Sequence, residues 1–324
     1  AQAYDRAGPA GSGGLEGVHR VIGLSTVWTS REARSGEELL GPILDMEFEG
    51  VELEYRITEQ RYEEIRPHIR NHEVQVLSIH NYFPVPPIIP PERVSGDCFS
   101  LSSLDREERD NGVSYTFHTL ETAHEVEARV VVLHLGRVET DLPRNGLQQL
   151  YRENASHDEI MKLLQQEREE RSRLRDPHLD ALLFSLERIV KRAEQLGVIV
   201  GIENRYYFQE MPDMEEIGII LDQFRGGPIG YWHDTGHAAV AETLGILQHE
   251  ALLKLYAPHL VGAHLHDARG IDDHKPPGQG EIDFEMVNRY LPEGGIKIME
   301  ILPSARGHEI VDGLNFLREK GFEP

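Results

Sequence analysis

Short apolar runs alternate with longer amphipathic segments along most of this chain. The apolar runs are nearly continuous and rich in valine and isoleucine, which is typical of parallel strands buried on both faces. Eight such runs cover residues 18–26, 50–57, 74–82, 128–136, 197–205, 229–235, 260–267 and 296–302. The pattern therefore predicts eight buried strands.

The segments between these runs carry apolar residues at helical spacing, most clearly at 57–69, 103–126, 213–224 and 241–257. Ahead of the fifth strand, we expect a leucine-rich helix that begins near Asp180 and ends at Gly197. Eight strands alternating with eight helices predict an α/β fold, a single-domain (β/α)8 TIM barrel.

Two stretches depart from this alternation. Residues 1–17 are rich in glycine and alanine without periodicity, which predicts a flexible leader ahead of a barrel over 18–324. Residues 137–177 form a long irregular insertion after the fourth strand, in which acids and arginines recur at i,i+4: Glu167 with Arg171 and Glu169 with Arg173. A solvated helix face is the simplest interpretation, and a lid or a contact between copies in a homo-oligomer is the alternative.

Composition and charge narrow the range of possible functions. Hydrophobic residues make up 39% of the chain and charged residues 27%, and no apolar run has the length of a membrane helix. The 56 acids and 33 bases give a formal charge of −23. This charge opposes binding to a nucleic-acid backbone and favours small ligands or cations. We therefore expect a small-molecule substrate, with no nucleic acid and no membrane.

Cysteine usage bears on the cellular compartment. Cys98 is the only cysteine, so the chain has no intrachain disulfide and no thiolate metal cage. A cytoplasmic location is the simplest expectation. The first residues, "AQA", resemble the new end left after removal of a signal peptide, so export stays open.

Titratable residues stand at the carboxyl ends of six predicted strands: His80, His134, Glu203, Asp234, His264 and Glu300. In a barrel, these strand ends converge on one mouth. A lone histidine at a strand end is usually a hydrogen-bonded structural residue, but six uncompensated polar groups would be too costly to bury. A metal ion is the economical explanation. Three carboxylates and one imidazole, from Glu203, Asp234, His264 and Glu300, suit Mn²⁺, Mg²⁺, Co²⁺ or Zn²⁺.

Neighbouring residues supply candidates for other roles. His237, in "HDTGHA", is a candidate ligand, substrate contact or proton carrier, whereas His233 and His266 are candidates for supporting or structural roles. Asn204, Arg205 and Tyr206 follow Glu203 directly, so they are candidate substrate contacts. Trp28 and Trp232 would either wall the pocket or pack in the core.

The motifs "GIEN", "HDTGHA", "HLHD", "PPGQGEIDF" and "MEI" together resemble the xylose isomerase-like superfamily of TIM barrels over residues 18–322. That superfamily includes sugar phosphate isomerases and epimerases as well as the endonuclease IV group.

Resemblance to the epimerase branch implies one divalent metal held by Glu203, Asp234, His264 and Glu300. It also implies that Glu203 and Glu300 move a proton at the carbon beside a metal-polarised carbonyl, through an enediolate. His237 then contacts a substrate oxygen, and Arg269 lies near the family's arginine. The predicted activity is a metal-dependent isomerase or epimerase of a keto sugar or polyol derivative.

Resemblance to the endonuclease IV branch implies more metal ions, with additional ligands from His80, His134, His237, Asp272 and His274. The negative charge and the absence of a basic, aromatic loop in the sequence oppose a DNA substrate. In the sugar branch, Asp272 and His274 would instead order the loop after the seventh strand. A multi-zinc phosphodiesterase, a sugar dehydratase or lyase, and a sugar-binding protein without turnover remain as alternatives.

Overall fold

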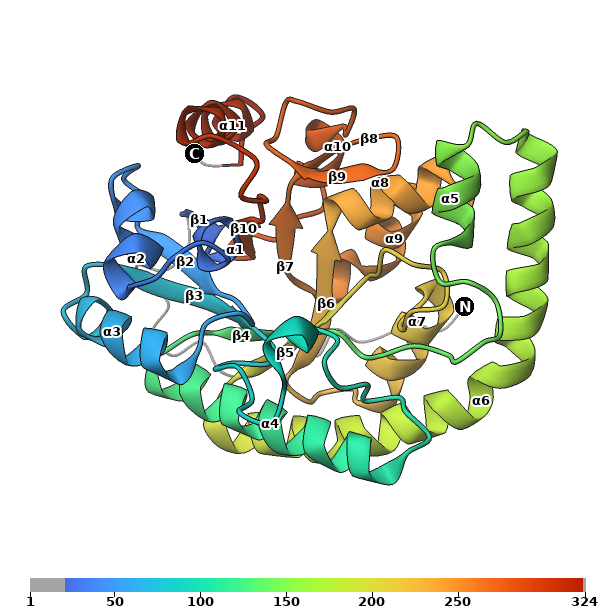
Figure 1. Ribbon diagram of the computed structural model, residues 1–324, viewed down its shortest axis with the longest axis horizontal. Coiled ribbons are helices and arrows are strands. Elements are labelled where there is room, and N and C mark those ends of the chain that lie inside the picture. The colour runs from blue at the N-terminus through green and yellow to red at the C-terminus, as the bar shows by residue number, and fades with distance from the viewer. Residues whose placement is uncertain (1–20, 323–324) are drawn as a thin grey trace, which may run out of the picture.

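The computed structural model describes residues 21–322, in which parallel strands close into a barrel with helices packed around it (Figure 1). The strands are β1 (Ile22–Ser25), β2 (Gly50–Leu53), β3 (Gln75–His80), β4 (Val130–Leu133), β5 (Ile199–Glu203), β6 (Ile229–Asp234), β7 (Leu260–Leu265) and β10 (Ile296–Met299). Their order around the barrel is β1-β10-β7-β6-β5-β4-β3-β2. The predicted (β/α)8 barrel is confirmed, and the predicted leader at 1–17 lies outside the described residues.

Helices connect the strands on the outside of the barrel. They are α1 (Val27–Ser30), α2 (Gly36–Leu44), α3 (Glu59–Arg70), α4 (Arg106–Glu125), α5 (Gly146–Arg152), α6 (His157–Leu196), α7 (Met214–Gln223), α8 (Thr235–Thr243), α9 (His249–Tyr256), α10 (Phe284–Asn288) and α11 (Gly307–Glu319). The helix predicted over 241–257 is split between α8 and α9, because Gly245 has a φ of 73° that breaks the helical path. No helix between residues 21 and 322 has the length and apolarity needed to cross a membrane.

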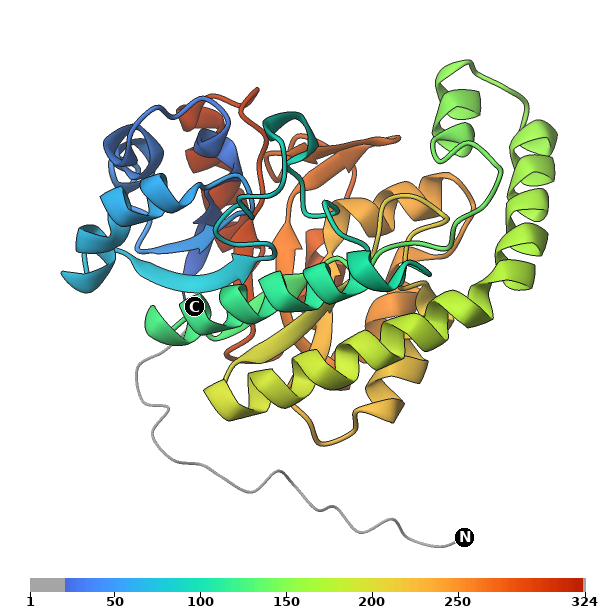
Figure 2. The same cartoon turned by 60° about the horizontal axis from the view of Figure 1, so that its bottom comes forward.

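Helix α6 begins earlier than predicted. Ser156 and Glu159 form a capping box at its start, and Gly197 ends it in the left-handed conformation. The expected start near Asp180 is wrong, because α6 runs without a break from His157 through Pro177 to Leu196. Both ribbon views show α5 and the first half of α6 projecting beside the barrel (Figures 1 and 2).

Part of the predicted solvated face of α6 is buried. Glu167 and Arg171 are only 2% and 3% exposed. Arg171 donates hydrogen bonds to the carboxylates of Asp213 and Glu216 at the start of α7, at 2.6 and 2.8 Å. The prediction of a solvated face is therefore wrong for Glu167 and Arg171, whereas Glu169 and Arg173 are exposed as predicted.

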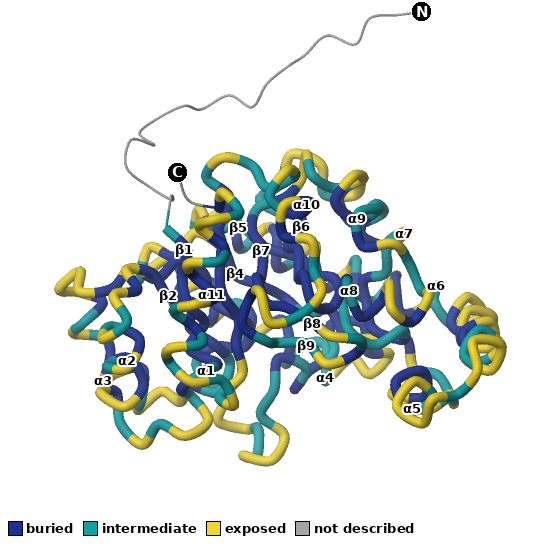
Figure 3. Tube along the Cα trace, turned by 90° about the horizontal axis from the view of Figure 1, so that it is seen from above, coloured by how far each residue is buried: buried dark blue, intermediate teal, exposed yellow. Residues whose placement is uncertain are grey.

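Apolar side chains form a layer on each side of the strands, which appear as a buried centre from above (Figure 3). The larger cluster lies between barrel and helices. A smaller one comprises Leu77, Val130, Val132, Trp232, Ile296 and Ile298. Val132, Trp232 and Ile298 each precede a strand-end polar residue by two positions, and side chains two apart share a face. The polar groups therefore lie above an apolar floor inside the barrel.

The segment after β7 is a hairpin of β8 (Asp267–Arg269) and β9 (Asp272–Lys275), where the sequence predicted a loop. Gly270 makes its turn with a φ of 61°. Asp267 accepts backbone N–H groups from Gly278 and Ile282, at 2.9 and 3.1 Å, and so ties down the following "PPGQGEI" segment. These hydrogen bonds hold the hairpin and the segment after it together at the edge of the barrel mouth.

Candidate metal centre

Four predicted ligands meet at the mouth of the barrel. Glu203 and Asp234 end β5 and β6, His264 lies near the end of β7, and Glu300 follows β10. All four are buried, and one ligand atom of each lies within 4.8 Å of the others. Nδ1 of His264 is 3.1 Å from Glu203 Oε1, 3.6 Å from Asp234 Oδ2 and 3.2 Å from Glu300 Oε2. The parallel barrel thus gathers residues that are far apart in sequence.

The electrostatics of this cluster keep its carboxylates ionised. Burial acts to raise the pKa of Glu203, but the charge of His264 and the neighbouring imidazoles hold it well below its ordinary range. Burial likewise opposes ionisation of Asp234, whose pKa is held low chiefly by His237. His264 also lowers the pKa of Glu300 against the effect of burial. Three ionised carboxylates around one imidazole attract a divalent cation.

The donor set fits such an ion. Oε2 of the buried Glu203 forms no aligned hydrogen bond, although Nε2 of His134 and Nη1 of Arg205 lie 3.0 and 3.6 Å from it, so this oxygen keeps a lone pair for a metal ion. Oxygen ligands with one imidazole nitrogen suit Mn²⁺, Mg²⁺, Co²⁺ or Zn²⁺. Glu203, Asp234, His264 and Glu300 are therefore the residues that would hold it.

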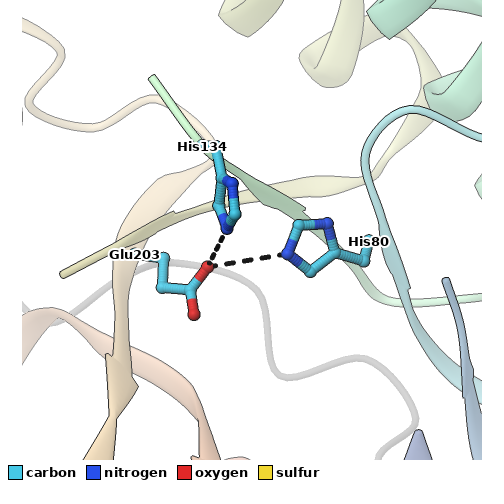
Figure 4. Close-up of side chains that lie close together, drawn as sticks. All are labelled: His80, His134 and Glu203. Carbon is cyan, nitrogen blue, oxygen red and sulfur yellow. Dashed lines mark ion pairs between the residues drawn. The ribbon is translucent and has the colours of Figure 1, made fainter. Parts of the chain in front are cut away.

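His80 of β3 and His134 after β4 face the same Glu203 carboxylate (Figure 4). Their Nε2 atoms lie 3.6 and 3.0 Å from its Oε2. Nδ1 of His80 donates to the carbonyl of Asn81, and Nδ1 of His134 contacts Asp97 at 3.0 Å. Burial acts to lower the pKa of His134, but Asp97 and Glu203 raise it to about 9. These three residues form a second group able to hold a metal.

A third group consists of His237, Asp273 and His274. Nδ1 of His237 donates to the carbonyl of Asn204 at 3.0 Å, and its Nε2 lies 3.8 Å from Asp273 Oδ2. Sequence reasoning named Asp272 instead, which is exposed on β9. Asp273 and the adjacent His274 both belong to this group, because the φ of 54° at His274 interrupts the alternation of side chains expected along a strand.

His266 and His233 are both fully buried and hydrogen-bonded. Nδ1 of His266 accepts the backbone N–H of His274 at 2.8 Å, so its Nε2 donates to Asp234 at 2.9 Å. His266 thereby orients one predicted ligand, as expected for a supporting residue. The ring nitrogens of His233 contact Tyr231 and His249.

A cavity of about 370 Å³ opens over these groups, with Tyr55, Arg205 and Tyr206 in its walls. Nη2 of Arg205 lies 3.3 Å from Asp97 and 3.2 Å from Glu210, whereas its buried Nε and Nη1 have no hydrogen-bond partner. Because Nη1 lies 3.6 Å from Glu203 Oε2 in an ion pair, Nε is the donor left for a substrate oxygen. Tyr55, Asp97 and Glu210 were not predicted from the sequence. Tyr55 lies inside the predicted strand 50–57 and looks like any other aromatic strand residue, whereas Asp97 and Glu210 lie between predicted elements, where an isolated acid carries no periodic signal.

Four other predicted substrate contacts do not appear among the described residues that line this cavity. Asn204 lies behind Asp234, bonded to both its backbone N–H and its carbonyl. Arg269 is exposed, and Trp28 donates to a backbone carbonyl beyond β10. Trp232 belongs to the apolar floor. Direct contact between these residues and a substrate stays a prediction.

Residues 42–320 match the family model described as xylose isomerase-like TIM barrel. The chain belongs to this family. The match confirms the resemblance carried by the strand-end motifs. The comparison with curated protein sequences gave no match.

Solved structures of this xylose isomerase-like fold align over nearly the whole chain. A D-tagatose 3-epimerase-like protein is 21% identical, covers 93% of this chain and 96% of its own, and has a TM-score of 0.64. An L-ribulose 3-epimerase is 16% identical, with coverages of 93% and 96% and a TM-score of 0.63. A 3-keto-D-glucoside 4-epimerase from E. coli is 15% identical, with coverages of 92% and 98% and a TM-score of 0.64. At these identities the likeness establishes the fold.

Proposed function

We propose that this protein is a divalent-metal-dependent isomerase or epimerase of a keto sugar or polyol derivative. The observation that carries the proposal is the buried convergence of Glu203, Asp234, His264 and Glu300 within 4.8 Å beneath an open cavity. The epimerases among the structural neighbours support the same class of chemistry.

Each protein group has a defined task in this proposal. A divalent cation held by the four residues supplies Lewis-acid stabilisation of negative charge on a substrate oxygen. Glu203 and Glu300 stand on strands three places apart in the barrel, so their carboxylates approach a substrate from two sides. One takes a proton from the carbon beside the carbonyl, and the other, in its protonated form, returns a proton from its own side.

The cavity walls orient the substrate. Because Nδ1 of His237 donates to a backbone carbonyl, its Nε2 is available to a substrate hydroxyl. Nε of Arg205, which has no hydrogen-bond partner, offers a further donor. We therefore infer that the hydroxyl groups of the substrate bind on the side of β5 and β6.

Solvent isotope exchange tests the proposed reaction. Metal-loaded protein is incubated with a panel of ketoses in D₂O, and we expect deuterium beside the carbonyl together with an epimer or isomer. Glu203→Gln and Glu300→Gln should lower exchange by at least about 100-fold. The control Glu281→Gln, at an exposed loop position, should retain it. Ligand binding without exchange would contradict the proposal and favour a sugar-binding protein, and a dehydrated product would favour a lyase.

Substitutions of two neighbouring histidines distinguish a metal ligand from a residue that orients a ligand. We expect His264→Ala to lose bound metal and activity, because it removes the only imidazole of the four-residue group. His266→Ala should still bind the metal, with lower affinity, and lose about 1–3 kcal/mol of stability, since it leaves a buried carboxylate contact unmade. Metal analysis and denaturant unfolding measure these effects. Full metal content in His264→Ala would refute its role as a ligand.

A multi-zinc phosphodiesterase is the second candidate function. The groups His80–His134–Glu203 and His237–Asp273–His274, which flank the first, favour it. The formal charge of −23 opposes a nucleic-acid substrate. Metal content per chain decides between the two candidates: close to one ion supports the sugar enzyme. Two or three zinc ions, together with cleavage of abasic-site DNA, would support the phosphodiesterase.

A further inference from the structure

A buried carboxylate outside the four-residue group also contacts His264. Glu52 of β2 is 0% exposed, and sequence reasoning did not single it out. Its Oε1 accepts a hydrogen bond from Ser25 Oγ at 3.0 Å, and its Oε2 accepts one from Ser78 Oγ at 2.8 Å. Nε2 of His264 lies 3.2 and 3.0 Å from these two oxygens. Glu52 thus binds the ring nitrogen that faces away from the candidate metal centre.

Strand register explains how Glu52 is held. Ser25 of β1 is paired with Glu52, and Glu52 is paired with Ser78 of β3, so the three side chains enter the barrel side by side. His264 reaches them from β7, three places away around the barrel. Two hydroxyl donors and one imidazole therefore fix the carboxylate in a buried position.

Three other histidines that face the centre follow a related rule. In each of them an acceptor holds one ring nitrogen, Nδ1, and Nε2 faces the mouth: His80 on Asn81, His134 on Asp97 and His237 on Asn204. His264 is reversed, because its Nε2 is held and its Nδ1 faces three carboxylates. A neutral ring with its proton on Nδ1 would present an N–H group where a metal needs a lone pair.

We propose that Glu52 is a positioning residue that holds a proton on Nε2 of His264, so that Nδ1 is the nitrogen that binds the metal. This role rests on the proposed function, in which His264 is a ligand. Carboxylates that orient a metal-bound histidine typically change metal affinity by about 10- to 100-fold when removed. Glu52 does not line the substrate cavity, so the KM for the sugar should change less than the metal affinity does.

Metal affinity tests the proposal directly. Metal-free protein is titrated with Co²⁺ or Zn²⁺ against a chromophoric chelator. We expect about 10-fold weaker binding for the isosteric Glu52→Gln, whose amide oxygen can still accept the Nε2 proton, and about 100-fold weaker binding for Glu52→Ala. Ser78→Ala is the matched control, because it removes one donor to Glu52 and leaves the Glu52–His264 contact in place. Unchanged affinity in folded Glu52 variants would overturn the proposal.

A second readout uses the wild-type protein. In ¹⁵N-histidine-labelled protein, we expect a downfield Nε2–H resonance of His264 both with and without Zn²⁺, assigned by its loss in His264→Ala. Zinc bound through Nε2, with the proton on Nδ1, would overturn the role of Glu52 alone. Absence of any divalent metal binding, with the Nε2–H resonance intact, would overturn the proposed function and the positioning role together.

Discussion

Glu167 of α6 is a buried carboxylate for which neither oxygen has a hydrogen-bond partner. Its spacing from Arg171 suggested an i,i+4 ion pair, but Arg171 bonds to the start of α7 instead. Burial and the nearby carboxylate of Glu170 raise the pKa of Glu167 to about 7. Helical spacing brings two side chains close, yet the tertiary neighbours decide which contact is made.

This shift predicts a pH dependence of stability. A folded-state pKa above the ordinary 4.5 means that the protonated form stabilises the fold fully below that value, and this contribution is lost as pH rises through about 7. Between about pH 5 and about pH 8, wild-type stability should therefore fall more steeply than that of Glu167→Gln. Denaturant unfolding at both pH values measures the difference. The exposed Glu169→Gln serves as control, and parallel profiles for wild type and Glu167→Gln would contradict the prediction.

At the scale of elements, the junction between β6 and α8 delivers two candidate groups at once. Asp234 ends the strand and caps the helix, accepting the backbone N–H of His237 at 2.7 Å. Gly236 between them approaches the ring of His266 so closely that a Cβ would lie 2.1 Å from its Cε1. This turn therefore requires glycine for reasons of space.

Gly236→Ala should consequently push His266 away from Asp234. We expect a loss of about 1–3 kcal/mol of stability, as for overpacking elsewhere, together with weaker metal binding. Gly307→Ala, near the start of α11, is the matched control, because its Cβ would meet neighbours only at 3.5 Å and beyond. Chemical unfolding and metal titration of both variants provide the measurements. Wild-type stability and metal affinity in Gly236→Ala would contradict this account of the junction.

At the scale of the whole molecule, the site is an acidic centre in a strongly acidic protein, with a formal charge of −23. Its carboxylates come from strands on several sides of the barrel. A bound cation would offset the repulsion between these negative charges and so link the strands that carry them. The unfolded chain lacks this arrangement, and metal binding should therefore favour the folded state.

Metal removal should accordingly lower the thermal stability. A ligand that binds only the folded state adds about 2.7 kcal/mol at 100 times its Kd, so adding Mn²⁺ or Zn²⁺ to chelator-treated protein should raise its Tm by several degrees. The same addition should leave the Tm of His264→Ala nearly unchanged. Equal shifts in both proteins would place the stabilising ion elsewhere.

Several features that sequence reasoning missed left a local signal. Ser156 and Glu159 have the spacing of a capping box and mark the true start of α6, although the leucine-rich pattern after Asp180 suggested a later one. Gly245 marks the break between α8 and α9. Glu52 lies within a strand that is predicted to be buried, where an acidic residue is unexpected. In each case the signal was short and competed with a stronger periodic pattern.

The sequence by itself determined the barrel and the residues at its mouth. Continuous apolar runs specify buried parallel strands, and a parallel barrel must bring their carboxyl ends together. Only the tertiary structure decided which atoms meet. The contact between Glu52 and His264 depends on strand register across the barrel, and the choice of Asp273 over Asp272 depends on the conformation of the hairpin, in which His274 has a φ of 54°. Both are properties of packing in three dimensions, which spacing along the chain does not encode.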